Sequence, residues 1–255
     1  MANAILVNSL LAGILFPVNT ASFISTAMQA AGWTLVDTYN SGQSMTFSWT
    51  LNASTKGTVF ANIVVTTNAI NFNLLETWNT TTRTGTLSTT NSGGGFSLSN
   101  STTTIYCTAI NHPELRGIVL SQYGNSTRFL GALRPQGLAP SWWNESSFCW
   151  AFAPSNAFPP TFFSTSAPWA NASNLNCINS SQLQDGNTYN GNARSILPLI
   201  LMNNGNTGVL ATCNDVVICA SAGLLVGDTL TVSGSEVYTY IYSSTGTNGI
   251  AIRTT

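Results

Sequence analysis

Short runs rich in Thr, Val and aromatic residues, with apolar and polar positions interleaved, cover most of this 255-residue chain and are separated by turn residues. Such runs are typical of β strands, because successive side chains of a strand point to opposite faces of a sheet. The pattern predicts a mainly β fold of antiparallel sandwich or meander sheets. The runs at 105–110, 116–123 and 128–134 are spaced as a three-stranded meander. The other predicted strands lie within 33–39, 44–52, 58–67, 70–79, 195–204, 208–221, 228–234, 236–244 and 249–255.

One segment near the N-terminus, "TASFISTAMQAAGW", has the spacing of a short helix instead. Thr20 or Ser22 is a suitable N-cap, because a side-chain oxygen can accept a hydrogen bond from a free backbone N–H of the first turn. Phe23, Ala27 and Met28 would then share one face. The helix is expected to run to about Ala31 and to end at Gly32.

The segment before this helix, "AILVNSLLAGILF" at residues 4–16, is strongly apolar. No Lys or Arg precedes Lys56, so the basic region of a secretion signal is missing, and the run is too short to span a bilayer. We expect this segment to be retained and to be buried against its own domain or against a neighbouring subunit.

The pattern divides the chain into three parts. Residues 1–152 form the helix and a β-rich part, residues 153–192 form an irregular insertion with prolines and aromatics, and residues 193–255 form a C-terminal β part that packs on the first as one domain. Residues 80–104 hold few large apolar side chains and three consecutive glycines, which indicates a flexible loop at the end of a long hairpin.

Charge is unusually scarce in this sequence. Only 6% of the residues are charged, against about 25% in typical soluble domains, and the net charge is −1. Such a surface has no field to attract nucleic acid or anionic lipid, so we expect neither nucleic acid nor a membrane among the partners. A surface of hydroxyls and amides suits a protein that is held in an assembly.

The sequence offers little catalytic chemistry. Its one histidine, His112, lies in a predicted turn beside Glu114 and Arg116, and no Gly-x-Ser-x-Gly motif occurs. "SGSE" at 233–236 is a hairpin turn. Glu145, beside two tryptophans, is the best candidate for a catalytic carboxylate, but a solvated turn carboxylate is the simpler interpretation of this residue. We therefore predict no catalytic residue, no metal site and no cofactor.

The five cysteines form no CxxC motif, so they indicate neither a zinc site nor a redox motif. Cys213 and Cys219 could bridge a tight hairpin, or both could be buried thiols. The five are Cys107, Cys149, Cys177, Cys213 and Cys219.

Aromatic residues gather between residue 129 and the end of the predicted insertion. Pro135 and Pro140 end a strand, and the tryptophans that follow could either close the core or form a contact surface for sugars or a partner subunit. The candidate contact surface comprises Trp142, Trp143, Trp150, Phe158, Phe162, Phe163 and Trp169.

Three stretches resemble the virion structural proteins of tailed bacteriophages and prophages. They are "GWTLVDTY" after the helix, "RFLGALRP" followed by Trp142 and Trp143, and the closing "GDTLTVSGSEVYTYIYSSTGTNGIAIRTT" at 227–255. The resemblance covers roughly residues 20–50, 115–150 and 223–255. It implies a non-enzymatic virion protein of the tail or baseplate, which contacts other virion proteins and itself as a homo-oligomer.

Other functions stay open from the sequence. One is a receptor-binding or glycan-binding fibre or adhesin module that recognises a host surface glycan, and another is a capsid decoration (cement) protein. A third is a tail enzyme that degrades polysaccharide with Glu145.

Overall fold

The computed structural model is mostly β strand with a single described helix, α1 (Val18–Ala30), which confirms the predicted fold class. Among the described residues, all pairs of neighbouring strands are antiparallel, and these strands form three sheets. The residues described are 3–12, 17–52, 56–75, 77–86, 93–97, 104–122, 128–134, 150–152, 162–164, 176–177, 194–202, 209–220, 223–232, 235–243 and 248–255.

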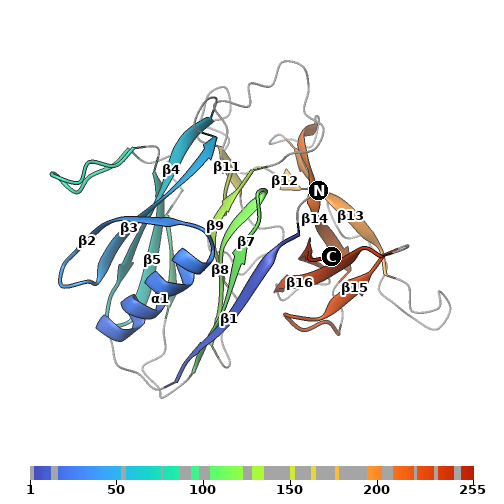
Figure 1. Cartoon of the computed structure of the whole chain (residues 1–255), viewed down its shortest axis with the longest axis horizontal. Helices are drawn as coiled ribbons and strands as arrows, with labels where there is room; N and C mark the ends of the chain where they lie inside the picture. The colour runs from blue at the N-terminus through green and yellow to red at the C-terminus, as the bar shows by residue number, and fades with distance from the viewer. Residues whose placement is uncertain are drawn as a thin grey trace.

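The three sheets are stacked side by side, as Figure 1 shows from left to right. The outer sheet has the order β2 (Thr34–Tyr39), β3 (Ser44–Asn52), β4 (Lys56–Val65), β5 (Ala69–Leu75) and β6 (Gly93–Ser97). The central sheet has the order β1 (Ile5–Leu11), β7 (Ile105–Asn111), β8 (Leu115–Gln122), β9 (Arg128–Leu133), β10 (Trp150–Phe152) and β11 (Phe162–Ser164). The C-terminal sheet has the order β12 (Asn176–Cys177), β13 (Ile196–Met202), β14 (Val209–Ala220), β17 (Asn248–Arg253), β16 (Val237–Ser243) and β15 (Thr229–Thr231).

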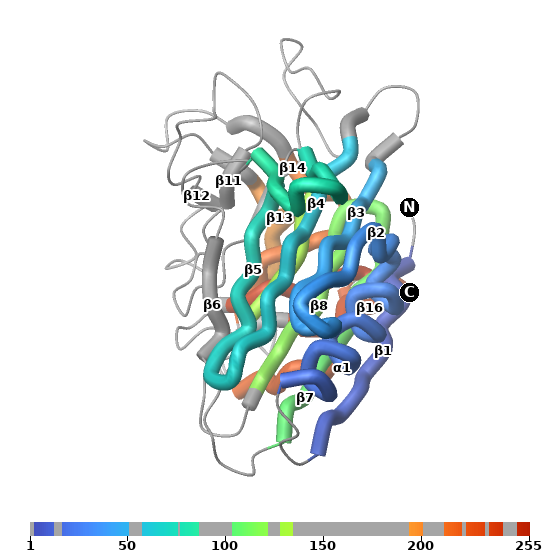
Figure 2. The backbone as a smooth tube through the Cα atoms, turned by 90° about the vertical axis from the view of Figure 1, so that its left-hand side faces the viewer, coloured from blue at the N-terminus to red at the C-terminus, as the bar shows by residue number. Residues whose placement is uncertain are grey.

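The main hydrophobic core lies between the outer sheet and the central sheet. Helix α1 contributes to it from one side, where it contacts β1 and β7 as well as β2, β3 and β4 (Figure 2). Phe47 and Phe72 of the outer sheet are fully buried there. The rings of Trp33 and Trp49 meet edge to face at 5.8 Å between centroids, an arrangement that aromatic quadrupoles favour.

The helix begins earlier than the sequence predicted. Pro17 occupies the N-cap position without a side-chain cap, and Thr20 and Ser22 already lie within the helix. Proline tolerates this place because its fixed φ suits a helix start and its missing N–H has no partner there anyway. The end at Gly32 is confirmed, since its φ of +81° is a backbone conformation that L side chains rarely adopt.

The apolar N-terminal segment forms an edge strand. One of the two alternatives from the sequence, burial of this segment by its own domain, is therefore wrong. Within it, β1 pairs with β7, while residues 13–16 lie outside the described residues. Ile5, Val7 and Leu10 keep 60%, 41% and 54% of their side-chain surface exposed. Burial against a neighbouring subunit stays a prediction.

The glycine-rich stretch was predicted as a loop, but part of it is a strand. Gly93, Gly94 and Gly95 lie in β6 and pair with residues 71–73 of β5. Glycine has no side chain that could reveal the two-residue period of a strand, so the sequence pattern could not show this one. Residues 87–92 and 98–103 lie outside the described part of the chain.

The predicted meander of β7, β8 and β9 is confirmed. Two glycines allow β8 and β9 to approach each other closely. Gly117 and Gly131 are opposite each other on β8 and β9, under the ring of Phe129. A Cβ added to Gly131 would lie 2.3 Å from Arg116 O and 2.8 Å from Phe129 Cζ. Only glycine fits at this close approach of two strands.

Cys213 and Cys219 are buried and neither forms a disulfide, so the alternative of a bridged hairpin is wrong. Both lie in the single strand β14. Six residues of strand span about 20 Å, far beyond the roughly 7 Å that a disulfide allows between Cα atoms. Cys107 is also a buried free thiol.

Within the described part of the chain, no helix combines the length and the apolar character needed to cross a bilayer. The strands on either side of the predicted hairpin turn at 233–236 pair antiparallel, β15 with β16, and Val232 N donates a hydrogen bond to Glu236 O, while residues 233 and 234 lie outside the described residues.

Candidate functional site

Five side chains of a chain that has few charges gather where the central sheet meets the C-terminal sheet. They are His112 and Glu114 from the turn between β7 and β8, Asp215 from β14, Arg253 from β17 and Glu236 just before β16. We call this group the polar junction. His112 and Glu114 are almost completely inaccessible to solvent, and Asp215 is buried.

The turn between β7 and β8 sets the orientation of His112. Its backbone exchanges two hydrogen bonds with Leu115, from His112 N to Leu115 O and from Leu115 N to His112 O, which close a tight turn. The Glu114 N–H donates to Nδ1 of His112 at 3.0 Å. A neutral imidazole has one donor and one acceptor nitrogen, so Nε2 carries the hydrogen and faces Asp215 Oδ2 at 3.5 Å.

The carboxylate of Glu114 holds an irregular part of β14. The pairing of β14 with β13 jumps from Val217 to Thr212, which releases the residues between them from the ladder. Glu114 accepts hydrogen bonds from Asn214 N at 2.8 and 3.1 Å and from Asp215 N at 2.8 Å. A buried backbone N–H without a partner is costly, so the carboxylate stabilises this bulge and ties the two sheets together.

Arg253 links the junction to the last strands. Its guanidinium lies 3.6 Å from Asp215 Oδ1 and 3.6 Å from Glu236 Oε1. Glu236 keeps 34% of its side-chain surface exposed, whereas Arg253 keeps 15%. The junction therefore changes from a buried end at Glu114 to a partly solvated end at Glu236, where ion pairs contribute little to stability.

This geometry favours a structural role for the polar junction. A general acid or base must come within hydrogen-bond reach of a substrate, but His112 and Glu114 are covered by the two sheets that they connect. Their hydrogen-bonding groups face backbone N–H groups and Asp215. Among the described residues, no group of three or more His, Cys, Asp or Glu side chains is placed to hold a metal ion.

Burial also keeps Cys107 and Cys213 protonated at neutral pH. It raises the pKa of the Cys107 thiol to about 12, although a hydrogen bond with Ser9 acts in the other direction. It raises the pKa of Cys213 well above its ordinary value, and the nearby Glu114 and Asp215 add to this effect. Because the thiolate is the reactive form, neither thiol has the character of a nucleophile at neutral pH.

The exposed edge strand β1 is a second feature, and the sequence left open whether its own domain or a neighbouring subunit covers it. Edge strands of soluble proteins are usually protected by charged residues, proline or short length. β1 has seven residues, none of them charged and none a proline, and Ile5, Val7 and Leu10 are exposed. Among the described strands, β1 is paired only with β7, and Ala4, just before β1, donates a backbone hydrogen bond to Arg253 O of β17.

The structure places part of the candidate contact surface. Trp150 lies in β10, opposite Leu133 of β9, and Phe162 and Phe163 lie in β11, the last described strand at the other edge of the central sheet. The backbones of these three residues are therefore neighbours. The predicted contact residues Trp142, Trp143, Phe158 and Trp169, and the carboxylate candidate Glu145, lie outside the described residues.

Comparison with models of protein families and with curated proteins finds no match to this chain.

The sequence around His112 could not have revealed the polar junction, because Asn214, Asp215 and Arg253, the other members and contacts of the junction, are about 100 and 140 residues away in the sequence.

Proposed function

We propose that this protein is a non-enzymatic structural component of a virion, of the tail or baseplate type, and that it acts through contacts between subunits. The observation that carries the proposal is the unprotected apolar edge of β1, where Ile5, Val7 and Leu10 are exposed. Such an edge offers both free backbone hydrogen-bonding groups and apolar side chains to another chain.

The partner at this edge is a second copy of the chain. Two antiparallel β1 strands related by a twofold axis would place Asn8, the middle residue of Ile5–Leu11, opposite its own copy. Leu6 would then lie opposite Leu10 of the second copy, on the same face. The pairing would extend the central sheet across two subunits and would cover apolar side chains that are exposed in the single chain.

The residues behind the family resemblance support a structural function. Gly131 of "RFLGALRP" allows β8 and β9 to approach closely. In the closing stretch, Gly227 has a φ of +101° and the Asp228 carboxylate accepts a hydrogen bond from Leu225 N at 2.8 Å, so both shape a turn before β15. These residues shape strands and a turn, so the sequence positions that resemble virion proteins have a role in the fold.

The experiment is a measurement of molar mass by light scattering on the purified full chain and on two lysine variants. Val7→Lys places a charge in the proposed interface, while Val36→Lys places one on another valine, which is 37% exposed and belongs to β2 at the edge of the outer sheet, a different sheet from that of β1. We expect an oligomer for the parent and for Val36→Lys, and single-chain mass for Val7→Lys. A parent of single-chain mass at every concentration, or an unchanged oligomer in Val7→Lys, would refute the proposal.

A further inference from the structure

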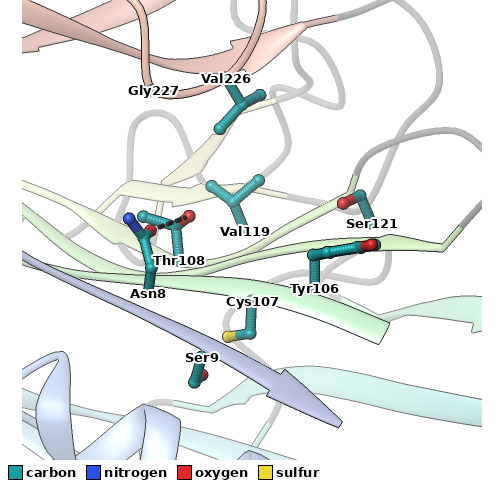
Figure 3. A pocket seen from close by; sticks show the side chains of 9 residues that line it. All are labelled: Asn8, Ser9, Tyr106, Cys107, Thr108, Val119, Ser121, Val226 and Gly227. Carbon is teal, nitrogen blue, oxygen red and sulfur yellow. Dashed lines mark hydrogen bonds between the residues drawn. The ribbon is translucent and has the colours of Figure 1, made fainter. Parts of the chain in front are cut away.

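A pocket of about 260 Å³ lies between the central sheet and the turn that precedes β15 (Figure 3). Asn8 of β1, Tyr106 and Thr108 of β7, and Val119 and Ser121 of β8 form its floor, and Val226 hangs over them from the turn. The pocket is slightly smaller than the roughly 300–1,000 Å³ of sites for drug-sized ligands. Its size suits a single ring with its substituents.

Strand register explains why these floor residues meet. Asn8 is paired with Thr108, and Thr108 with Val119, so the three form one row across β1, β7 and β8. Tyr106 is paired with Ser121 in the next row on the same face. In Figure 3 these side chains point toward the turn, whereas Ser9 and Cys107 point to the other face of the sheet.

The chemistry of the pocket is polar but uncharged. Thr108 Oγ1 donates to Asn8 Oδ1 at 2.8 Å, which fixes the Asn8 amide and leaves its two N–H donors for a ligand. Tyr106 keeps 55% of its surface exposed and presents a ring and a hydroxyl, and Ser121 adds a second hydroxyl. Val119 and Val226 provide the apolar contact that ring C–H groups require.

We propose that this pocket binds one sugar residue of a neutral glycan. A pyranose ring has hydroxyls that both donate and accept, and it has an apolar C–H face that packs on an aromatic ring. The amide and hydroxyls of the pocket match the first property and Tyr106 matches the second. Since no lining side chain is charged, a sialylated or uronic-acid glycan would gain no ion pair here.

The test uses the full chain on an array of neutral hexose and N-acetylhexosamine oligosaccharides, printed beside sialylated and uronate-containing ones, followed by titration of the best neutral ligand. Tyr106→Ala and Asn8→Ala remove the ring and the amide. Thr50→Ala is the control, because Thr50 is an exposed threonine of the outer sheet, away from the pocket in the central sheet. Its hydroxyl forms a hydrogen bond with Thr58 of the neighbouring strand, as the hydroxyl of Thr108 does with Asn8. Circular dichroism melts confirm that each variant is folded.

We expect the parent and Thr50→Ala to bind a neutral oligosaccharide with equal affinity, and each pocket variant to bind at least about tenfold more weakly. The inference is overturned if no neutral glycan binds, if only charged glycans bind, or if either pocket variant keeps the parent affinity. The molar mass of Tyr106→Ala is measured in parallel. An unchanged oligomer with lost binding separates this site from the subunit contacts proposed above.

Discussion

The buried carboxylate of Glu114 gives the most quantitative prediction. Glu114→Gln keeps the shape of the side chain, but its amide nitrogen is a donor that would face one of the two backbone N–H groups of Asn214 and Asp215. With the amide oxygen in the place of Oε2, Asn214 N loses its 2.8 Å bond to Oε1 and meets an N–H donor there, at about 1–3 kcal/mol. The bonds that remain at Oε2 lose the assistance of charge, at about 1 kcal/mol more. We expect a loss of about 2–4 kcal/mol out of a total stability of 5–15 kcal/mol.

The assay is urea unfolding followed by circular dichroism, with the midpoint and slope compared between variants. Glu236→Gln is the matched control, because Glu236 belongs to the same polar junction but is 34% exposed and pairs with Arg253 at 3.6 Å. We expect it to cost about 0–1 kcal/mol. If Glu114→Gln costs no more than Glu236→Gln, the carboxylate does not hold the bulge of β14 and our account of the junction is wrong.

Two further predictions concern pH and salt. Because burial raises the pKa of Cys107 to about 12, the unfolded chain loses this proton at lower pH than the native chain does, so the free energy of unfolding should fall as the pH rises from about 9 to 12. Urea midpoints at several pH values should show a shallower fall for Cys107→Ala, and an identical fall would exclude this thiol as a cause. The proposed subunit contacts contain no ion pair, so the molar mass should stay constant from about 0.05 to 1 M salt; dissociation over that range would contradict an apolar interface.

The local elements could be predicted because each has a local cause. Alternating side chains identified β3, β4 and β5, and the φ requirement at Gly32 identified the end of α1. The start of α1 was misplaced because Pro17 begins the helix without a side-chain cap, whereas Thr20 has the side chain of a capping residue. The sequence pattern therefore agrees with the structure for the three strands and for the end of the helix, and differs from it at the start of the helix.

The features that suggest function depend on contacts between distant segments, and the sequence could not reveal them. An apolar segment such as β1 looks the same whether its partner is the same chain or another one, so its exposure is visible only in three dimensions. In the polar junction, Glu114 accepts a hydrogen bond from Asn214 N in the bulge of β14, and the pattern of apolar and polar residues does not predict this bulge. The sugar-sized pocket requires the register of three strands and a turn about 100 residues further along the chain.

The central claim, that β1 is a contact between subunits of a structural assembly, is tested most directly by an electron cryo-microscopy reconstruction of the oligomer formed by the full chain. We expect β1 of one subunit to lie hydrogen-bonded and antiparallel to β1 of the next, with Ile5, Val7 and Leu10 covered. A reconstruction in which the subunits meet elsewhere and these three side chains stay exposed to solvent would contradict it.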